Sequence, residues 1–323
     1  MNATDTTETI RSRLASPATQ RVLRWGGPVI WAIALVIVWA DDGLPLSRDR
    51  LLMWILLGLL AFSLTNVRGW VQSVVLEWLP FALILWAYDL LRGQADGLLF
   101  QAHILPQLRA DEILGAGVAP TVRLQDWLWD GPFDIHWYDY FVWLVYVSYF
   151  LATYVVAAIL WFVARDRFRR YVVMVSVVAM MGFATYALFP AAPPWMASEL
   201  GELAPTTRSI GIIWSHIPIG NFDNLYEKGA NYSNQVAAVP SLHAAYTLLV
   251  TLILWPLVKP RWARVVLALY PVAMAFALVY TAEHYLVDIL LGWVYTLIAY
   301  WAVTRLFRAW AERRERRDAV AST

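Results

Sequence analysis

The chain has 323 residues and contains no cysteine. This absence excludes disulfide bonds, thiolate metal sites and cysteine nucleophiles, so any covalent chemistry must use other side chains. Charged residues are also scarce, because Asp, Glu, Lys and Arg together make up only 15% of the chain. The formal net charge of +1 gives neither the basic excess of a nucleic-acid-binding protein nor the acidic excess of a disordered segment. No nucleic-acid partner is therefore expected.

Hydrophobic residues, in contrast, make up 60% of the chain. A transmembrane helix needs roughly 20 mainly apolar residues to cross about 30 Å of hydrocarbon. Eight apolar runs approach or reach this length, and the first two are the shortest. The sequence therefore predicts an all-α, polytopic membrane helical bundle of about eight transmembrane helices, with the lipid bilayer as its surroundings. The expected limits are 25–40, 51–67, 70–91, 139–164, 171–190, 240–258, 263–282 and 285–307.

Basic residues gather in alternate connections between these runs, which is the positive-inside pattern of membrane proteins. Eighteen of the 25 Lys and Arg residues fall on one side, together with both chain ends. An even number of crossings then predicts that both termini are cytoplasmic. The extracytoplasmic side carries two long, acidic connections, 92–138 and 191–239. Within the first of them, residues 121–129 are compatible with a short helix at the membrane interface.

A histidine and an aspartate lie four residues apart in the motif HYLVD, near the predicted outer start of the last helix. Residues at this spacing project from the same helix face, so Asp288 can hold one ring nitrogen of His284. A carboxylate that accepts from Nδ1–H leaves the Nε2 lone pair facing outward and stabilises the positive charge that develops on attack. His284 is therefore a candidate nucleophile. The alternative is an ion pair that only satisfies itself at a helix end.

A second histidine lies in the motif AVPSLHAAY, at the predicted outer start of the sixth helix. Pro240 suits a first helical turn, and Ser241 can cap the helix or donate to an anion. The free N–H groups and the dipole of such a terminus attract oxyanions, which suits His243 to protonate a leaving oxygen. The alternative is a capped helix with an incidental histidine. The predicted crossings, however, bring His243, His284 and Asp288 to the same outer level.

A third motif, FPAAPPW, follows the fifth predicted helix, where Pro190, Pro193 and Pro194 make a rigid helix exit. The series FPAAPPW, AVPSLHAAY and EHYLVDILLG resembles the motifs of the type 2 phosphatidic acid phosphatase (PAP2) superfamily. More closely, it is similar to the inositol phosphorylceramide synthase branch, whose members are inositolphosphotransferases. The resemblance implies a six-helix catalytic core over about residues 70–310. A cytoplasmic N-terminus with a two-helix extension, 1–69, would precede this core, and a cytoplasmic tail, 311–323, would follow it.

The resemblance also implies a two-step phosphoryl transfer that needs no metal or other cofactor. In this scheme His284 attacks phosphorus, Asp288 orients it, and His243 protonates the leaving alkoxide. The resulting phosphohistidine passes its group to water in a phosphatase, or to the hydroxyl of a lipid or polyol in a transferase. The other three histidines of the chain lack the short paired spacing of a zinc or iron site, which agrees with an enzyme without a metal.

The sequence departs from the superfamily pattern in its basic residues. The broad phosphatase pattern has an arginine six residues before the nucleophile, where this chain has Leu278. That pattern also has a lysine and an arginine before its PSGH-type motif, and the segment before FPAAPPW contains neither. This departure favours transfer over simple hydrolysis. Other cations are then expected to bind the phosphate, because the transition state spreads negative charge over its oxygens.

The first candidate for this role is Arg92 on the third helix, with Asp89 three residues earlier and able to pair with it. A similar Asp-to-Arg stretch occurs in the synthase branch. The alternative is an arginine that Asp89 holds at the headgroup boundary. Arg208 and Lys228, in the second outer connection, are reserve candidates, or else ordinary solvated loop charges.

The leading interpretation is a membrane-embedded lipid phosphotransferase that acts at the extracytoplasmic boundary on a phospholipid or a polyprenyl phosphate. A lipid phosphate phosphatase with the same site is the second interpretation, and the two differ in whether the acceptor is water. The two long outer connections are long enough to keep water from a phosphohistidine. From another class, a transporter or a membrane scaffold stays open. A transporter would show repeated halves and polar groups near the midplane, and the sequence shows neither.

Overall fold

A computed structural model gives the fold of residues 16–42, 48–94, 101–217 and 235–321. These residues form helices, and the only β-type pairing within them consists of two isolated bridges. The chain divides into two compact units. The first consists mainly of Met1–Ala82, and the second contains Leu83–Pro218 and Phe222–Thr323.

The first unit begins with a pair of packed helices, α2 (Pro17–Asp42) and α3 (Arg48–Phe62). Gly58 permits their close approach, because a Cβ at this position would lie 2.9 Å from the Trp31 ring. The indole N–H of Trp31 on α2 also donates to the carbonyl of Trp54 on α3 at 3.0 Å. The pair therefore combines apolar packing with one polar contact between the helices.

A long helical path follows α3 and leads into the second unit. It begins with a 3-10 turn, Leu64–Asn66, and continues as α4 (Val67–Ser73), a π-helical segment (Val74–Trp78) and α5 (Leu79–Gln94). The Asn66 side chain caps α4 by accepting from the Gly69 N–H at 3.0 Å. The predicted third run thus forms as one interrupted helical path rather than a uniform helix.

Five helices form the body of the second unit: α8 (Trp137–Val163), α9 (Arg165–Leu188), α13 (Leu242–Leu254), α14 (Arg261–Tyr280) and α15 (Leu286–Ala321). Helix α13 packs against each of the other four. Most of its side chains are therefore buried, which accounts for the almost continuous apolar sequence of this helix.

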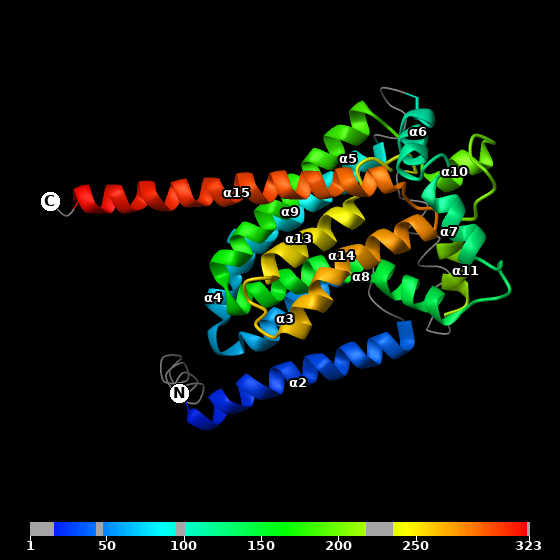
Figure 1. Ribbon diagram of the computed structural model, residues 1–323. Coiled ribbons are helices and arrows are strands. Elements are labelled where there is room, and N and C mark those ends of the chain that lie inside the picture. The colour runs from blue at the N-terminus through cyan, green and yellow to red at the C-terminus, as the bar shows by residue number, and fades with distance from the viewer. Residues whose placement is uncertain (1–15, 43–47, 95–100, 218–234, 322–323) are drawn as a thin grey trace. The chain divides into compact units, whose positions relative to one another are not determined.

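Four short helices gather at one end of this five-helix body (Figure 1). They are α6 (Leu105–Leu114), α7 (Pro120–Leu128), α10 (Pro194–Glu199) and α11 (Ser209–Ser215), and they come from the two long connections of the sequence. Helix α7 corresponds to the short helix expected over residues 121–129. Buried side chains of α6, α7 and α10 pack around Tyr285, just before α15 begins.

Six helices in the described part of the chain are long and apolar enough to cross a membrane. Two further predicted runs appear as shorter apolar helices, Arg50–Phe62 and Leu242–Leu254. The predicted all-α fold of a multi-pass integral membrane protein is thus confirmed. The expected sixth run, 240–258, is longer than the helix it produces, because Ser241 caps α13 and the helix ends at Leu254.

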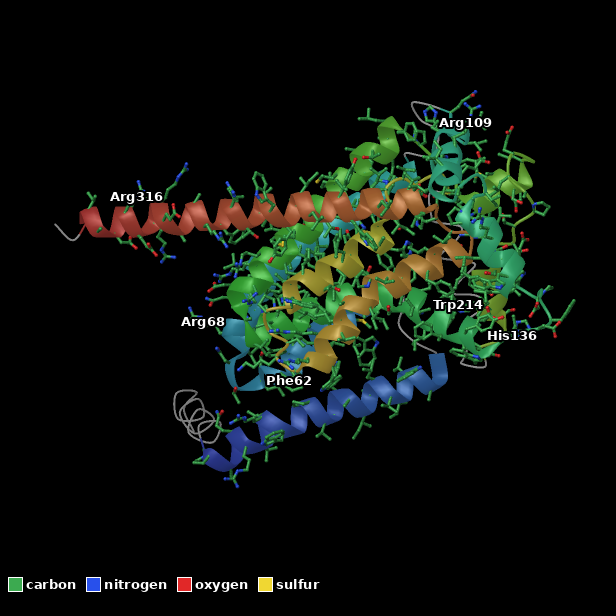
Figure 2. The ribbon with its side chains drawn as sticks, in the orientation of Figure 1. Phe62, Arg68, Arg109, His136, Trp214 and Arg316 are labelled. Atoms are coloured by element: carbon green, nitrogen blue, oxygen red, sulfur yellow. The ribbon has the colours of Figure 1, made fainter. Side chains whose placement is uncertain are left out.

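The basic ends of the long helices lie away from the short helices. Arg165 begins α9 and Arg261 begins α14, and both helices run from these ends toward the short helices. Helix α15 runs in the opposite direction and continues to Ala321, through most of the expected tail. Figure 2 shows Arg316 near the end of α15, remote from Arg109 and His136 at the other end of the unit.

Candidate active site

The two histidines that the sequence singles out lie together at the end of the second unit that carries the short helices. Their ring centroids are 5.6 Å apart, and the ring planes are tilted by 60°. His284 is buried in the tight connection between α14 and α15. His243 lies in the first turn of α13 and is partly exposed. The two residues thus come from different helices that the packing of α13 against α15 brings together.

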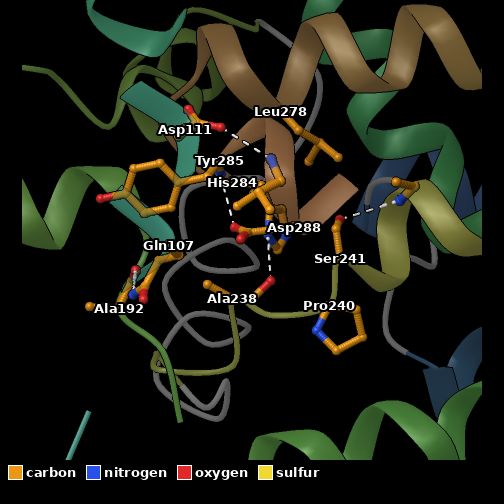
Figure 3. Close-up of polar contacts among 12 residues, drawn as sticks. Gln107, Asp111, Ala192, Ala238, Pro240, Ser241, Leu278, His284, Tyr285 and Asp288 are labelled. Carbon is orange, nitrogen blue, oxygen red and sulfur yellow. Dashed lines mark hydrogen bonds and ion pairs between the residues drawn. The ribbon is translucent and has the colours of Figure 1, made fainter. Parts of the chain in front are cut away.

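The ring of His284 is held through its Nδ1 atom by two acceptors (Figure 3). Nδ1 lies 3.0 Å from the carbonyl oxygen of Ala238 and 3.5 Å from Oδ2 of Asp288. Both acceptors favour a proton on Nδ1, so Nε2 keeps its lone pair. The sequence predicts the contact with Asp288, whereas the nearer acceptor, Ala238, was not expected.

Asp288 is fully buried and connects the elements that carry the two histidines. Its Oδ2 accepts from the Tyr285 N–H at 2.9 Å, which fixes the carboxylate beside His284. Its backbone carbonyl accepts from the Ser241 N–H at 3.0 Å, at the start of α13. Gly292 supports this contact, because a Cβ on Gly292 would collide with the Ser241 carbonyl oxygen. Helices α13 and α15 can therefore approach closely at the site.

The Ala238 carbonyl is positioned by backbone pairing of three chain segments. Ala191, within the FPAAPPW motif, forms isolated parallel bridges with His103 on one side and Ala237 on the other. The Ala238 N–H donates to the Ala191 carbonyl at 3.2 Å. The segments before α6, after α9 and before α13 are thus tied together. The FPAAPPW motif therefore does more than end a helix, because it also positions the Ala238 carbonyl, which is a hydrogen-bond acceptor for the His284 ring.

Ser241 caps α13, as the sequence predicts, with its Oγ accepting from the Ala244 N–H at 3.4 Å. The prediction that Pro240 occupies the first helical turn is wrong, because Ser241 is the N-cap and Pro240 precedes it. The carbonyl of Pro240 instead accepts a hydrogen bond from the Tyr186 hydroxyl at 2.7 Å. Pro240 therefore helps to attach the start of α13 to the end of α9.

Aromatic side chains of α8 surround His243. The Tyr146 ring stacks on the imidazole at a centroid distance of 5.2 Å, and the Tyr149 ring lies at 4.0 Å with a tilt of 41°. Phe150 contacts the same ring edge-on at 6.2 Å. These contacts restrict the orientation of the His243 ring.

Arg208 is brought next to the nucleophile candidate through Glu283, the residue directly before His284. Its Nε and Nη2 atoms lie 2.6 and 3.2 Å from the two carboxylate oxygens of Glu283. The guanidinium also lies over the Trp195 ring, 4.7 Å from the centroid. This paired, stacked geometry suits arginine and would not suit lysine. Arg208 is therefore not an ordinary solvated loop charge.

The loop that carries Arg208 is clamped by Gln125 on α7. The Gln125 side chain accepts from the Thr207 N–H at 2.7 Å and donates to the Thr207 carbonyl at 2.7 Å. It also donates to the Tyr280 carbonyl at the end of α14, at 2.8 Å. One buried amide thus fixes the residue before Arg208 relative to the chain that leads into His284.

The remaining predicted phosphate-binding residues are not brought to the site by the described contacts. Asp89 and Arg92 both belong to α5, and the side chain of Arg92 lies outside the described residues. Lys228 also lies outside them. Leu278, at the position where the superfamily pattern has arginine, is buried, and its carbonyl accepts from the N–H groups of Glu283 and His284.

Three residues that sequence reasoning missed join the site through long-range contacts. They are Asp111, which bonds to the first turn of α15, Gln125 and Glu283. The chain separations of these contacts are 176, 155 and 75 residues. No local spacing signals such partners. The one sequence signal that could have marked Asp111 and Gln125 is a polar residue on the apolar face of a predicted helix.

Comparison with known protein families matches residues 110–302 to the PAP2 superfamily. This match covers more than half of the chain. The chain belongs to the PAP2 superfamily. The resemblance inferred from FPAAPPW, AVPSLHAAY and EHYLVDILLG is thereby confirmed, and this PAP2 protein is an integral membrane enzyme of the phosphatase or phosphotransferase type.

A curated relative agrees with the branch that the motifs indicate. The chain is 29% identical over 284 residues to the phosphoinositol dihydroceramide synthase of Bacteroides thetaiotaomicron. The aligned region covers 82% of this chain and 86% of the relative. No solved structure matches the chain significantly. The matched PAP2 region includes His243, His284, Asp288 and Arg208, whereas Asp89 and Arg92 precede it.

Proposed function

We propose that this PAP2 protein is a lipid phosphotransferase that moves an inositol phosphate headgroup from a phospholipid to a dihydroceramide-type acceptor. The observation that carries the proposal is the pair of acceptors on Nδ1 of His284, with the ring of His243 5.6 Å away. The name of the Bacteroides relative supports the choice of headgroup and acceptor. The missing superfamily cations support transfer over hydrolysis.

In the first step, Nε2 of His284 attacks the phosphorus of the donor phosphodiester. An N–P bond forms, and the bond from phosphorus to the lipid oxygen breaks. His243 gives its proton to the leaving alkoxide, which departs as diacylglycerol. Asp288 and the Ala238 carbonyl stabilise the positive charge that His284 acquires, because both accept from its Nδ1–H.

In the second step, His243 removes the proton from the acceptor hydroxyl. The resulting oxygen attacks phosphorus, the N–P bond breaks, and His284 is released in its starting state. The product is a phosphoinositol ester of the acceptor lipid. Both steps use one site, so donor lipid and acceptor lipid bind in turn.

Arg208 is the predicted cation best suited to bind the phosphate oxygens. Glu283 and Trp195 hold its guanidinium in a fixed place beside the backbone of His284. A cation held in advance stabilises developing negative charge without reorganisation during the reaction. Both termini are proposed to be cytoplasmic, which would put this site at the extracytoplasmic membrane boundary.

The test is a lipid assay with purified protein in detergent. Phosphatidylinositol, phosphatidic acid and a polyprenyl diphosphate are offered as donors, each with and without dihydroceramide. Phosphate release and lipid products are followed together. We expect a phosphoinositol lipid product that depends on phosphatidylinositol and dihydroceramide. Phosphate release without any transfer product would contradict the transferase proposal and support the phosphatase alternative.

The matched variants are His284→Ala and His216→Ala. His284→Ala should lower turnover roughly a thousand-fold or more, because it removes the nucleophile. His216, which is exposed at the end of α11, should be replaceable without loss. Full turnover of His284→Ala would show that the proposed nucleophile is wrong.

A further inference from the structure

Asp111 on α6 makes a direct contact with the helix that carries Asp288. Its Oδ1 accepts from the Val287 N–H at 3.1 Å, in the first turn of α15 (Figure 3). The Asp111 side chain is fully buried. A buried carboxylate in this position is costly unless its contacts compensate the loss of water. The burial of Asp111 therefore needs a compensating role.

The first turn of α15 exposes backbone N–H groups that have no partner within the helix. Two carboxylates accept from N–H groups at this end of α15, one from the residue just before the helix and the other from its first turn. Asp288 accepts from the Tyr285 N–H at 2.9 Å, whereas Asp111 accepts from the Val287 N–H. Negative charge at a helix N-terminus is also favoured by the helix dipole. Asp111 thus acts as a cap supplied by another helix, one turn away from His284.

Helix α6, which carries Asp111, is itself anchored to the site. The Gln107 side chain donates to the Ala192 carbonyl at 3.2 Å and also to the His103 carbonyl. Leu108 packs in the same buried cluster as Tyr285. Asp111 therefore projects from a helix that is fixed both to the FPAAPPW motif and to the start of α15.

We propose that Asp111 is a positioning residue for the phosphoryl transfer. By holding the Val287 N–H, it sets the first turn of α15 so that the Asp288 carboxylate faces Nδ1 of His284. The role of Asp111 rests on the proposed function of His284 and deepens it. Asp111 touches neither substrate nor reacting atoms, so its removal should act through the alignment of Asp288 and His284.

The pKa of Asp111 also differs from that of an exposed capping carboxylate. Burial raises the pKa of its carboxyl from 3.8 to about 7, the hydrogen bond from Val287 opposes this rise, and the charge of Asp288 adds to it. Ionisable groups near Asp111 and Asp288 include Tyr285 and Glu112, and His284 pairs with Asp288. The folded protein therefore keeps the Asp111 proton to higher pH than the unfolded chain. This carboxyl favours folding at low pH, and its contribution is lost as the pH rises from 3.8 to about 7.

The experiment compares Asp111→Ala, Asp111→Asn and the matched control Asp126→Asn in the full-length protein. Asp126 is an exposed carboxylate on α7. For each protein, kcat and KM are measured with the donor that the wild type uses, and thermal unfolding is measured at about pH 5 and about pH 8. The asparagine variant keeps an acceptor for the Val287 N–H but cannot ionise.

We expect Asp111→Ala to lower kcat about 10- to 100-fold with little change in KM, because small misplacements of reacting groups cost this much. Asp111→Asn should retain kcat within a few-fold. Relative to the wild type, the unfolding temperature of Asp111→Asn should be higher at about pH 8 than at about pH 5. Asp126→Asn should match the wild type in all measurements.

Wild-type kcat in Asp111→Ala would overturn the proposal, and so would a kcat of Asp111→Asn as low as that of the alanine variant. If Asp111→Ala does not fold, the asparagine variant decides by the same criterion. Loss of activity in His284→Ala together with normal activity in Asp111→Ala would refute only the positioning role. An inactive wild type would refute the proposed function, while the pH dependence of unfolding would still test the buried carboxyl.

Discussion

The two site histidines have different chemical tasks, and single substitutions can separate them. His284 would form a bond to phosphorus, so it is required whatever the leaving group is. His243 would protonate the leaving oxygen, and this task matters only when that oxygen is a poor leaving group. The aromatic contacts of His243 with Tyr146 and Tyr149 hold the ring in place but do not themselves supply a proton.

We therefore predict that His243→Ala depends strongly on the leaving group. With phosphatidylinositol, its turnover should fall about 10²- to 10⁴-fold, which is the usual contribution of a general acid. With a p-nitrophenyl phosphoinositol ester, most of the first-step loss should disappear, because nitrophenolate leaves without a proton. The release of nitrophenol in a single turnover measures this step.

His284→Ala is the comparison for this measurement and should be inactive with both donors. An equal loss for His243→Ala with the two donors would refute the role of His243 as general acid. The residue scale is also where sequence reasoning was most successful. The spacing of His284 and Asp288 predicted their contact, which is present at 3.5 Å. The expected shared helix face is wrong, because α15 begins at Leu286 and His284 lies in the connection before it.

The elements that cover the site explain how a cation can be fixed there without the usual superfamily arginine. Helix α7 contributes no candidate catalytic residue, yet its Gln125 joins the Arg208 loop to the end of α14. Arg208 in turn pairs with Glu283 beside His284. The short helices of the long connections are thus part of the site architecture. The sequence predicted one of them as an interfacial helix and gave no sign of the clamp.

Gln125→Leu should therefore affect both stability and donor binding. It leaves the Thr207 N–H and carbonyl and the Tyr280 carbonyl without their partner, at a cost of about 2–4 kcal/mol in the free energy of unfolding. The displaced Arg208 should raise KM for the donor and lower kcat, and Arg208→Gln should have the same effect directly. Thermal unfolding and steady-state kinetics with the donor lipid measure the two effects.

The control on the same helix is Arg123→Ala, because this guanidinium is exposed and makes a long contact, 3.5 Å, with the Ala116 carbonyl among the described residues. Arg123→Ala should leave both stability and kinetics unchanged. If Gln125→Leu is destabilised but keeps wild-type kinetics, the clamp supports only the fold, and the link from Gln125 to Arg208 is refuted.

For the whole molecule, the distribution of basic residues predicts which membrane face carries the site. The basic ends of α9 and α14 and the arginines of α15 lie away from the short helices, and Arg316 marks the remote end of α15 in Figure 2. The positive-inside rule predicts that this end is cytoplasmic. The complete absence of cysteine allows a direct test, because every introduced thiol is then the only one.

We predict that Asp134→Cys is labelled by a membrane-impermeant maleimide in intact cells, whereas Arg169→Cys and Arg316→Cys are labelled only after permeabilisation. All three positions are exposed in the structure. The permeabilised cells show that each thiol can react. The opposite labelling pattern would put the site on the cytoplasmic face and overturn the proposed orientation.

The membrane character, the helical fold and the candidate catalytic trio can all be predicted from the amino-acid sequence. These properties depend on composition, on the length of apolar runs and on short spacings, all of which act locally along the chain. The trio also follows from the order of the motifs, which indicates the PAP2 superfamily, in agreement with the family match. Element ends were less well predicted, as Pro240 shows, because a cap depends on the contacts of one side chain.

The residues that support this trio could not be predicted in this way, because the folded structure brings them to it from distant parts of the chain. The Ala238 carbonyl, Asp111 and Gln125 act across chain separations of 46, 176 and 155 residues. Such contacts arise because buried polar groups need hydrogen-bond partners, and close packing places these partners on segments that are distant in the sequence. The absence of cysteine and the scarcity of charge set the chemistry that was possible, and packing selected the few polar groups that carry it out.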